Sequence, residues 1–483
     1  MKSIIKICMI TLAFWFVSCE NLSDLNIDPN NSSSARPQEV LTSTLGYIAF
    51  IMDSQYNDAA FLWGQYWTWG AGVSLGDEAR YIQIPSNTNQ AWARSYSDAL
   101  ADIKFLKGVE NTAFNGIGKV LEVFVYQYLV DHFGDVPYTD AIKGAIADGS
   151  VLAPTYDDDA AIYPQLLTSI DDALVDLRAA EADPVIVVGT EDLVYSGDLA
   201  SWIKFANSLK LRVLMRMSDV SDVAAQVRAV VAEGNFIETA DEIAEVPFSG
   251  ATGSENPMFA WEESGIGLFY KAATTVTDVQ DALNDPRKFF TYIPAVAHPG
   301  EIRAADQNEI ALIFTAEDKD WSDPSPVTYG AGVPTIFMSN WETWFLRAEA
   351  AVRFGTADDA ATAFTNAIDA NFTYLGAPDA ASYTANLGFG AASDAEKINM
   401  IGVQKWLSMN GLQEAEGWIE ARRFDTPENP IFYGPNGIFQ TPIQSALGDR
   451  VFPVRWLYPE SEQTLNSNAP PQSSITTKVF WDR

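Results

Sequence analysis

The spacing of hydrophobic and polar residues predicts a mostly helical protein. In residues 118–134, Val120, Phe124 and Tyr128 recur every four positions, with further hydrophobic residues beside them. Such a broad apolar surface indicates a helix that packs on two sides. Residues 157–182 begin with three aspartates, which favour a helix N-terminus, and then carry one apolar stripe. Both segments are therefore predicted to be long helices.

Two more segments, 199–220 and 340–372, continue the helical pattern, and the second is interrupted at "FGTADD". A helix, a short break and another helix are typical of tetratricopeptide-like pairs, although no strict 34-residue consensus is present. Small residues would let the paired helices approach closely; they are Ala348, Ala351, Ala360, Ala363 and Ala367.

Residues 235–335 follow a different pattern, because glycine and proline are frequent and the apolar runs are short. We expect loops and a few short strands there, laid over a helical scaffold. No linker separates autonomous halves, so residues 37–483 are predicted to form a single, mainly α domain with a loop-rich insert.

Composition and charge narrow the possible ligands. The 483 residues are 47% hydrophobic and 12% aromatic, enough for a large packed core, and the formal net charge is -34. So negative a surface repels phosphate backbones and anionic headgroups, which argues against a nucleic-acid partner. Sulfated or uronic-acid ligands are disfavoured for the same reason, whereas neutral ligands are unaffected.

The N-terminus predicts export and lipid anchoring. Lys2 and Lys6 precede an apolar run over residues 7–17, too short to span a bilayer, and Cys19 follows. "FVSC" resembles the lipobox of bacterial lipoproteins, so residues 1–18 are expected to be a signal peptide and Cys19 the acylated residue. The polar, turn-rich residues that follow, up to 36, are expected to be a flexible tether.

Several blocks resemble the SusD/RagB family of outer-membrane nutrient-binding lipoproteins. "DHFGDVPYTDAI" (131–142) is similar to the family signature DxxGDVPYSEA. Further blocks follow in the family's order; they include "GDLASWIKFANSLKLRVLMRMS", "QKWLSMNGLQEAEGWIEARRFDTP" and "FPVRWLYPESEQTLNSNA".

The resemblance implies a SusD-like fold and a non-catalytic function on the cell surface. A member would capture a neutral oligosaccharide or polysaccharide and deliver it to a SusC-like TonB-dependent transporter in the outer membrane. A RagB-like member that captures peptides is the alternative, because an acidic surface could attract cationic peptides. A glycoside hydrolase is a remote alternative.

The stretch "FLWGQYWTWG" (61–70) is the first candidate for ligand contact. On a continuous helix, Trp63 and Trp67 would share one face and Tyr66 and Trp69 another. A surface helix would then have to expose aromatic rings, on which a sugar can stack. Gln65 lies among them and could bind ligand hydroxyls.

Other candidates lie in predicted loops. "GDEARYIQIPSN" offers Arg80 and Tyr81, with Gln83 close by. A second cluster pairs Trp321 with Tyr329, and a third contains Trp261.

Motifs for catalysis are missing from the sequence. It contains no G-x-S-x-G elbow, no P-loop, no H-E-x-x-H and no Cys/His metal cluster. We therefore expect that the protein is not an enzyme and that it binds no cofactor. Acidic residues at Glu317, Asp318 and Asp320 could bind calcium, but they lack the spacing of an EF-hand, so a solvated loop is preferred.

Overall fold

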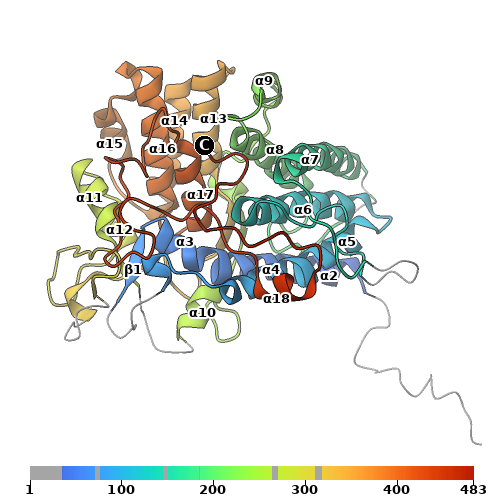
Figure 1. Ribbon diagram of the computed structural model, residues 1–483. Coiled ribbons are helices and arrows are strands. Elements are labelled where there is room, and N and C mark those ends of the chain that lie inside the picture. The colour runs from blue at the N-terminus through green and yellow to red at the C-terminus, as the bar shows by residue number, and fades with distance from the viewer. Residues whose placement is uncertain are drawn as a thin grey trace, which may run out of the picture.

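A computed structural model describes residues 35–70, 77–144, 151–183, 185, 187–263, 270–310 and 318–483 of the chain (Figure 1). The expected signal peptide, Cys19 and nearly all of the expected tether lie outside the described residues. Among the helices that are described, none is both long enough and apolar enough to cross a bilayer.

Helices dominate the fold, as the sequence predicted. Their bounds are α2 (Pro37–Ile51), α3 (Asn57–Trp63), α4 (Asn89–Arg94), α5 (Ala101–Lys107), α6 (Thr112–Phe133), α7 (Asp159–Glu181), α8 (Leu199–Arg216), α9 (Ala224–Glu233), α10 (Pro257–Glu263), α11 (Thr274–Ala282), α12 (Lys288–Thr291), α13 (Asn340–Phe354), α14 (Ala360–Leu375), α15 (Ala380–Leu387), α16 (Asp394–Met409), α17 (Glu414–Phe424) and α18 (Glu460–Leu465). Two π-helical segments, η3 (Met52–Tyr56) and η6 (Ser95–Leu100), join α2 to α3 and α4 to α5.

Short strands form two small sheets in the loop-rich part of the chain. β1 (Trp67–Trp69) pairs with β3 (Tyr270–Ala272), and β2 (Ala244–Val246) pairs with β4 (Thr335–Met338). Both pairs are antiparallel, and the second has an irregular register at its start. β2 and β3 lie within the segment predicted to contain a few short strands, and β4 begins at its last residue.

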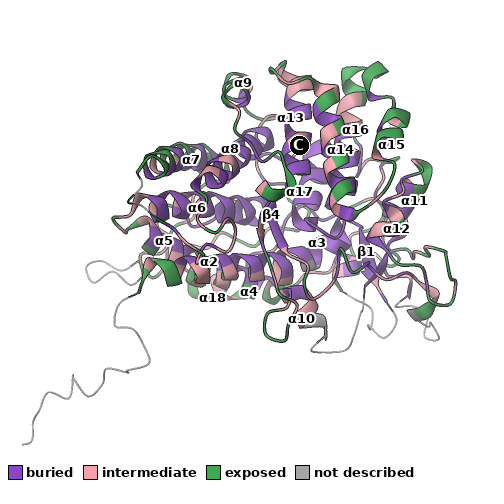
Figure 2. Cartoon of the chain, turned by 180° about the vertical axis from the view of Figure 1, so that it is seen from behind, coloured by how far each residue is buried: buried purple, intermediate pink, exposed green. Residues whose placement is uncertain are grey.

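The helices form two groups that stand side by side on a base formed by α2, α3 and α4 (Figure 1). One group contains α5 to α8, in which α6 packs on α7 and α7 on α8. The other contains α13 to α17, in which α13 packs on α14 and α16 on α17. Figure 2 shows that burial is greatest along α3, α6, α8 and α17, where the groups and the base meet.

α6 and α7 form for the reasons that the sequence indicates. Asn111 caps α6 by accepting a hydrogen bond from the Ala113 N–H (2.9 Å), and Gly134 ends it with φ +77°. Nearly all of α6 is buried, because it packs on two sides. Asp158 caps α7 through the Ala161 N–H, and α7 buries a single stripe.

The predicted helix pair at 340–372 is α13 and α14, which pack against one another. Gly355 ends α13 in the left-handed region (φ +60°), and Asp359 caps α14 by accepting from the Thr362 N–H. Ala348, Ala363 and Ala367 are buried, consistent with close approach of the two helices.

A buried ionic network holds the two helix groups together. Arg216 of α8 pairs with Asp131 of α6 (3.2 Å) and with Glu416 (2.7 Å) and Glu420 of α17. Burial alone would raise the pKa of Glu420, but neighbouring cations, Arg423 first, hold that pKa well below its usual range. All of these side chains are almost completely removed from water, so each charge depends on its partners.

Glu245 is a partly buried carboxyl that has no ion-pair partner among the described residues. It lies in β2, and its Oε2 atom is buried with no hydrogen-bond partner among the described residues. Burial raises the pKa of Glu245 from 4.5 to about 7. As pH rises, the unfolded chain therefore releases this proton at a lower pH than the folded protein does. The free energy of unfolding should fall as pH rises from about 4.5 through 7.

Replacing Glu245 with glutamine should remove this pH dependence. We expect Glu245→Gln to raise the free energy of unfolding by about 1–2 kcal/mol at pH 8 and to change it little at pH 4.5. Thermal unfolding at both pH values, measured against the parent protein, checks this expectation. An equal change at the two pH values would mean that the carboxylate charge is not the cause.

Candidate functional site

The aromatic stretch 61–70 is not one helix. α3 ends at Trp63, Gly64 and Gln65 turn the chain, and β1 begins at Trp67. Gln65 has φ +57°, and a Cβ on Gly64 would lie 2.7 Å from the Ala60 carbonyl oxygen. The premise of a continuous helix, on which the shared faces depended, was wrong, because the chain turns at Gly64 and Gln65.

The expectation that these rings lie open to water was also wrong. Trp63 is 1% exposed, and Tyr66 and Trp67 are 0% exposed. Each ring packs against a partner far away in the sequence; the pairs are Trp63 with Trp418 at 5.4 Å, Tyr66 with Trp406 at 5.4 Å, and Trp67 with Tyr270 at 5.2 Å between centroids. A fully buried ring cannot stack on a sugar unless the core opens.

Gln65 and Tyr81 are buried as well, against the expectation that they face ligand. Gln65 Nε2 donates to Tyr81 Oη (3.0 Å) and to the Gln440 carbonyl (2.7 Å), while its Oε1 accepts from Thr275. These two side chains thus tie β1 to the C-terminal segment. Arg80 is partly buried and pairs with Asp77 at 2.8 Å.

Trp69 differs from its neighbours because it keeps part of its surface exposed. It stacks on Tyr270 across the β1–β3 pair, with centroids 4.9 Å apart. Tyr270 in turn contacts Tyr329, which is only 6% exposed and therefore belongs to the core rather than to an open surface. Trp69 is thus the outer ring of an aromatic cluster.

The remaining candidates are not brought together. Trp321 is partly buried, and it has no ring contact with Tyr329 among the described contacts. The side chain of Trp261 and residue Glu317 lie outside the described residues. Calcium binding by Glu317, Asp318 and Asp320 therefore stays an untested alternative to the solvated loop that the sequence favoured.

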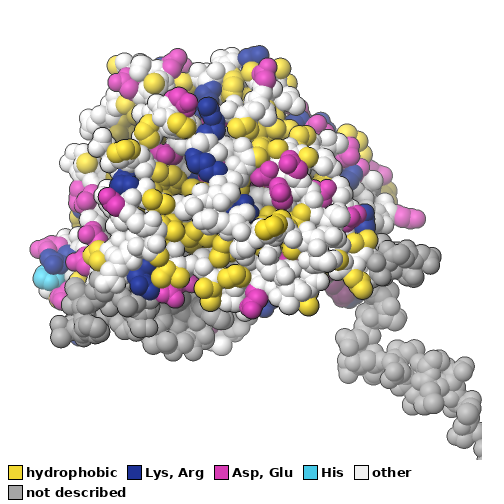
Figure 3. Space-filling view, in the orientation of Figure 1, with side chains coloured by type: hydrophobic (Ala, Val, Ile, Leu, Met, Phe, Trp, Pro, Cys, Tyr) yellow, Lys and Arg dark blue, Asp and Glu magenta, His cyan; other side chains and the backbone are white. Residues whose placement is uncertain are grey.

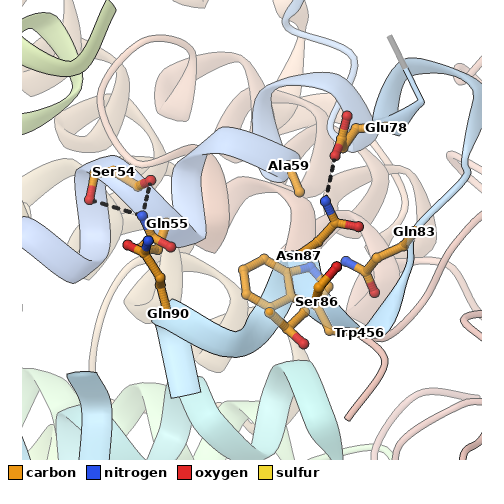
Figure 4. A pocket seen from close by; sticks show the side chains of 10 residues that line it. Ser54, Gln55, Ala59, Glu78, Gln83, Ser86, Asn87, Gln90 and Trp456 are labelled. Carbon is orange, nitrogen blue, oxygen red and sulfur yellow. Dashed lines mark hydrogen bonds between the residues drawn. The ribbon is translucent and has the colours of Figure 1, made fainter. Parts of the chain in front are cut away.

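A polar pocket of about 200 Å³ opens beside α3 (Figure 4). Three segments contribute to it: η3 with the start of α3, the loop over residues 78–90, and a residue from the C-terminal segment. Its lining residues are Ser54, Gln55, Ala59, Glu78, Gln83, Ser86, Asn87, Thr88, Gln90 and Trp456. None of these ten residues is Lys or Arg, and Glu78 is the only acid.

Buried groups fix the loop that forms this pocket. Trp63 Nε1 donates to the Glu78 carbonyl (3.1 Å), so the buried indole positions the pocket rim. Thr88 Oγ1 donates to the Leu457 carbonyl (3.0 Å). Asn87 Nδ2 donates to Glu78 Oε1 (3.1 Å), a contact drawn in Figure 4. The loop is therefore bound to both the helical core and the C-terminal segment.

Trp456 contributes to the lining although it is only 3% exposed. Its ring stacks on Tyr56 (5.2 Å) and meets His132 edge-on (4.6 Å). Burial lowers the pKa of His132 to about 3, so this imidazole is neutral at pH 7 and adds no positive charge beneath the pocket. Trp456 Nε1 has no hydrogen-bond partner among the described residues.

The arrangement suits recognition of an uncharged polar molecule. Amide and hydroxyl side chains provide both donors and acceptors, and hydrolysis of a glycosidic bond needs two carboxylates where this pocket has only Glu78. Sequence reasoning singled out Gln83 but missed Gln55, Asn87 and Trp456. The cluster of amides at 83–90 was the available signal, whereas the position of Trp456 depends on tertiary contacts.

Comparisons with known proteins identify the family and the fold. A family model described as SusD-like, starch-binding and associating with the outer membrane matches residues 29–459. Among solved structures, a chitin-binding protein shares 23% identity and a TM-score of 0.75, covering 92% of this chain and 100% of that chain. A SusD homologue from Bacteroides uniformis shares 22% identity and a TM-score of 0.74, covering 92% of this chain and 99% of that chain.

A third structure, a chitin-binding SusD homologue from Flavobacterium johnsoniae, shares 20% identity and a TM-score of 0.74, covering 92% of this chain and 97% of that chain. At such identities the solved structures show a common fold. A comparison with curated proteins found no significant match.

Proposed function

Because this chain belongs to the SusD-like family, we propose that it is a non-catalytic, cell-surface glycan-binding lipoprotein. It captures a neutral oligosaccharide or polysaccharide and delivers it to a SusC-like TonB-dependent transporter in the outer membrane. The lipid on Cys19 and the tether that follows hold it at the membrane. The family description and the chitin-binding proteins of the same fold support the choice of a glycan.

The polar pocket is the observation that carries the proposal. A sugar presents many hydroxyl groups and no charge, and the lining supplies side-chain amides and hydroxyls without any Lys or Arg. Its volume of about 200 Å³ is smaller than the usual site for a drug-sized ligand, so it receives one part of a longer chain.

The distribution of charge supports a neutral ligand. In Figure 3, Asp and Glu side chains are spread over the visible face and interspersed with a few Lys and Arg. With a formal net charge of -34, the protein repels polyanions at long range, whereas a neutral polysaccharide approaches unhindered. The partly exposed Trp69 offers a second, apolar contact for a long chain.

Blocking the pocket should abolish glycan binding without unfolding the protein. Ser86 is exposed at the pocket rim, and its side chain makes no hydrogen bond among the described contacts. We expect Ser86→Trp to weaken retention in native gels containing a neutral polysaccharide by about tenfold or more. The matched variant Ser86→Ala should bind within about threefold of the parent.

A panel of neutral polysaccharides, with polygalacturonate and a cationic peptide as comparators, completes the test. Retention by a neutral polysaccharide that Ser86→Trp loses supports the proposal. A parent protein that binds the peptide but none of the glycans would contradict it and favour a RagB-like peptide carrier. Cleavage of a retained glycan would contradict the non-catalytic role.

A further inference from the structure

The polar pocket contains a buried donor that no protein group satisfies. Trp456 is 3% exposed, lines the pocket, and has no partner for its Nε1–H among the described residues. A buried donor without a partner costs free energy that is regained when a ligand supplies an acceptor. The indole N–H only donates, so the missing group must be an acceptor such as an oxygen atom.

Gln83 places a second donor beside the first. Its Oε1 accepts a hydrogen bond from the Leu457 N–H (2.8 Å), next in sequence to Trp456. Because a backbone N–H can only donate, this contact fixes the orientation of the amide and makes its NH2 the group available to the pocket. Figure 4 shows the nitrogen of Gln83 directed toward the Trp456 indole.

The opposite wall combines an acceptor with an apolar surface. Gln55 Nε2 donates to the Ser54 carbonyl (2.7 Å), which leaves Gln55 Oε1 to accept from a ligand. Ala59, one turn further along the same helical segment, contributes its methyl group to the lining. The pocket therefore offers two donors, one acceptor and an apolar wall in a small volume.

We infer that this pocket recognises an acetamido substituent, and that the captured glycan contains N-acetylated amino sugars. This inference rests on the proposed glycan-binding function. The acetamido carbonyl oxygen has two lone pairs for Trp456 Nε1–H and Gln83 Nε2–H. Its N–H donates to Gln55 Oε1, and its methyl group lies against Ala59.

Other sugar substituents match this lining less well. A carboxylate or sulfate would also accept from both donors, but it would meet Glu78 and find no cation in the pocket. A hydroxyl carries no methyl for the apolar wall and would share a single oxygen between accepting and donating. The acetamido group uses every feature of the lining at once.

Paired neutral trisaccharides test the inference on the whole protein that remains after residues 1–18, the expected signal peptide, are removed. One pair consists of (1→4)-linked N-acetylglucosamine and glucose trimers, and a second pair consists of N-acetylgalactosamine and galactose trimers. Both members of a pair are uncharged, so the acidic surface does not bias the comparison. We expect calorimetric titration to show that at least one acetylated trimer binds about tenfold or more tightly than its hydroxyl counterpart.

A nearly isosteric substitution tests the donor pair. Gln83→Glu keeps an oxygen for the Leu457 N–H and replaces the NH2 donor with an acceptor that repels a carbonyl oxygen. We expect it to lower the affinity for the acetylated trimer by about tenfold and to leave the affinity for the hydroxyl trimer unreduced. The control Gln226→Glu puts the same charge on an exposed residue of α9, outside the pocket lining, and should change neither affinity by more than about twofold.

A second variant removes the other donor. Trp456→Phe keeps an aromatic ring against Tyr56 and lacks the N–H, and thermal unfolding identifies any loss of fold. The inference is overturned if the acetylated trimer and its hydroxyl counterpart bind with equal affinity in each pair. It is also overturned if Gln83→Glu lowers the affinities for the acetylated and the hydroxyl trimer equally. In that case neutral-glycan binding still supports the proposed function, whereas failure to bind any neutral glycan in the wider panel contradicts the function itself.

Discussion

Replacing Arg216 with alanine is expected to lower the free energy of unfolding by about 3–5 kcal/mol. Arg216 is buried and neutralises Asp131, Glu416 and Glu420, which come from α6 and α17. Without the guanidinium, these carboxylates remain buried with too little positive charge around them, and α8 keeps only the longer Arg212–Glu416 pair (3.7 Å) as an ionic contact with α17 among the described residues. Urea unfolding followed by circular dichroism measures the change.

A surface ion pair provides the control for Arg216. Arg178 pairs with Glu233, and the two side chains are 48% and 42% exposed. Arg178→Ala should therefore change the free energy of unfolding by no more than about 0.5 kcal/mol. Similar losses for Arg216→Ala and Arg178→Ala would contradict the view that the buried network is what binds the helix groups together.

Replacing Trp63 with alanine is expected to have an effect of similar size, for a different reason. The substitution removes a fully buried ring that packs on Trp418, which should cost about 3–5 kcal/mol through lost burial and the resulting cavity. It also removes the hydrogen bond from Trp63 Nε1 to the Glu78 carbonyl. Glycan binding should therefore fall as well, although the ring never touches the ligand.

Two comparisons separate the packing role of Trp63 from a ligand-binding role. Trp63→Phe keeps most of the buried ring but not the hydrogen bond, so it should retain more stability than Trp63→Ala while still loosening the rim at Glu78. Trp69→Ala, at a partly exposed ring, should cost clearly less stability. A stable Trp63→Ala protein with selectively lost binding would contradict burial of the ring.

The polar pocket owes its geometry to the aromatic core rather than to exposed aromatic rings. Both Trp63 and Trp456 are buried. Trp63 positions the rim by donating to the Glu78 carbonyl, and Trp456 contributes an Nε1–H that has no partner among the described residues. Polar side chains from the loop over residues 78–90 form most of the surface that a ligand can reach. This division explains how so aromatic a protein can present an amide-lined site.

Much of the helical architecture was predictable because local signals and hydrophobic periodicity agree. The four-residue spacing in α6, the acidic start of α7 and the break at Gly355 each indicated an element that the structure contains. The ordered sequence blocks also identified the family, since such blocks carry the capping and packing residues of a shared fold.

The sequence by itself thus determined the mainly α fold and the family, and it led to the prediction of an uncharged ligand, because periodicity, caps and net charge are properties of short segments or of the whole composition. Only the tertiary structure decided which aromatic rings are buried. The turn at Gly64 and Gln65 directs Trp63, Tyr66 and Trp67 toward partners that lie far away in the chain. It also decided the site, since Gln83 and Trp456 meet through contacts that span more than 370 residues of sequence.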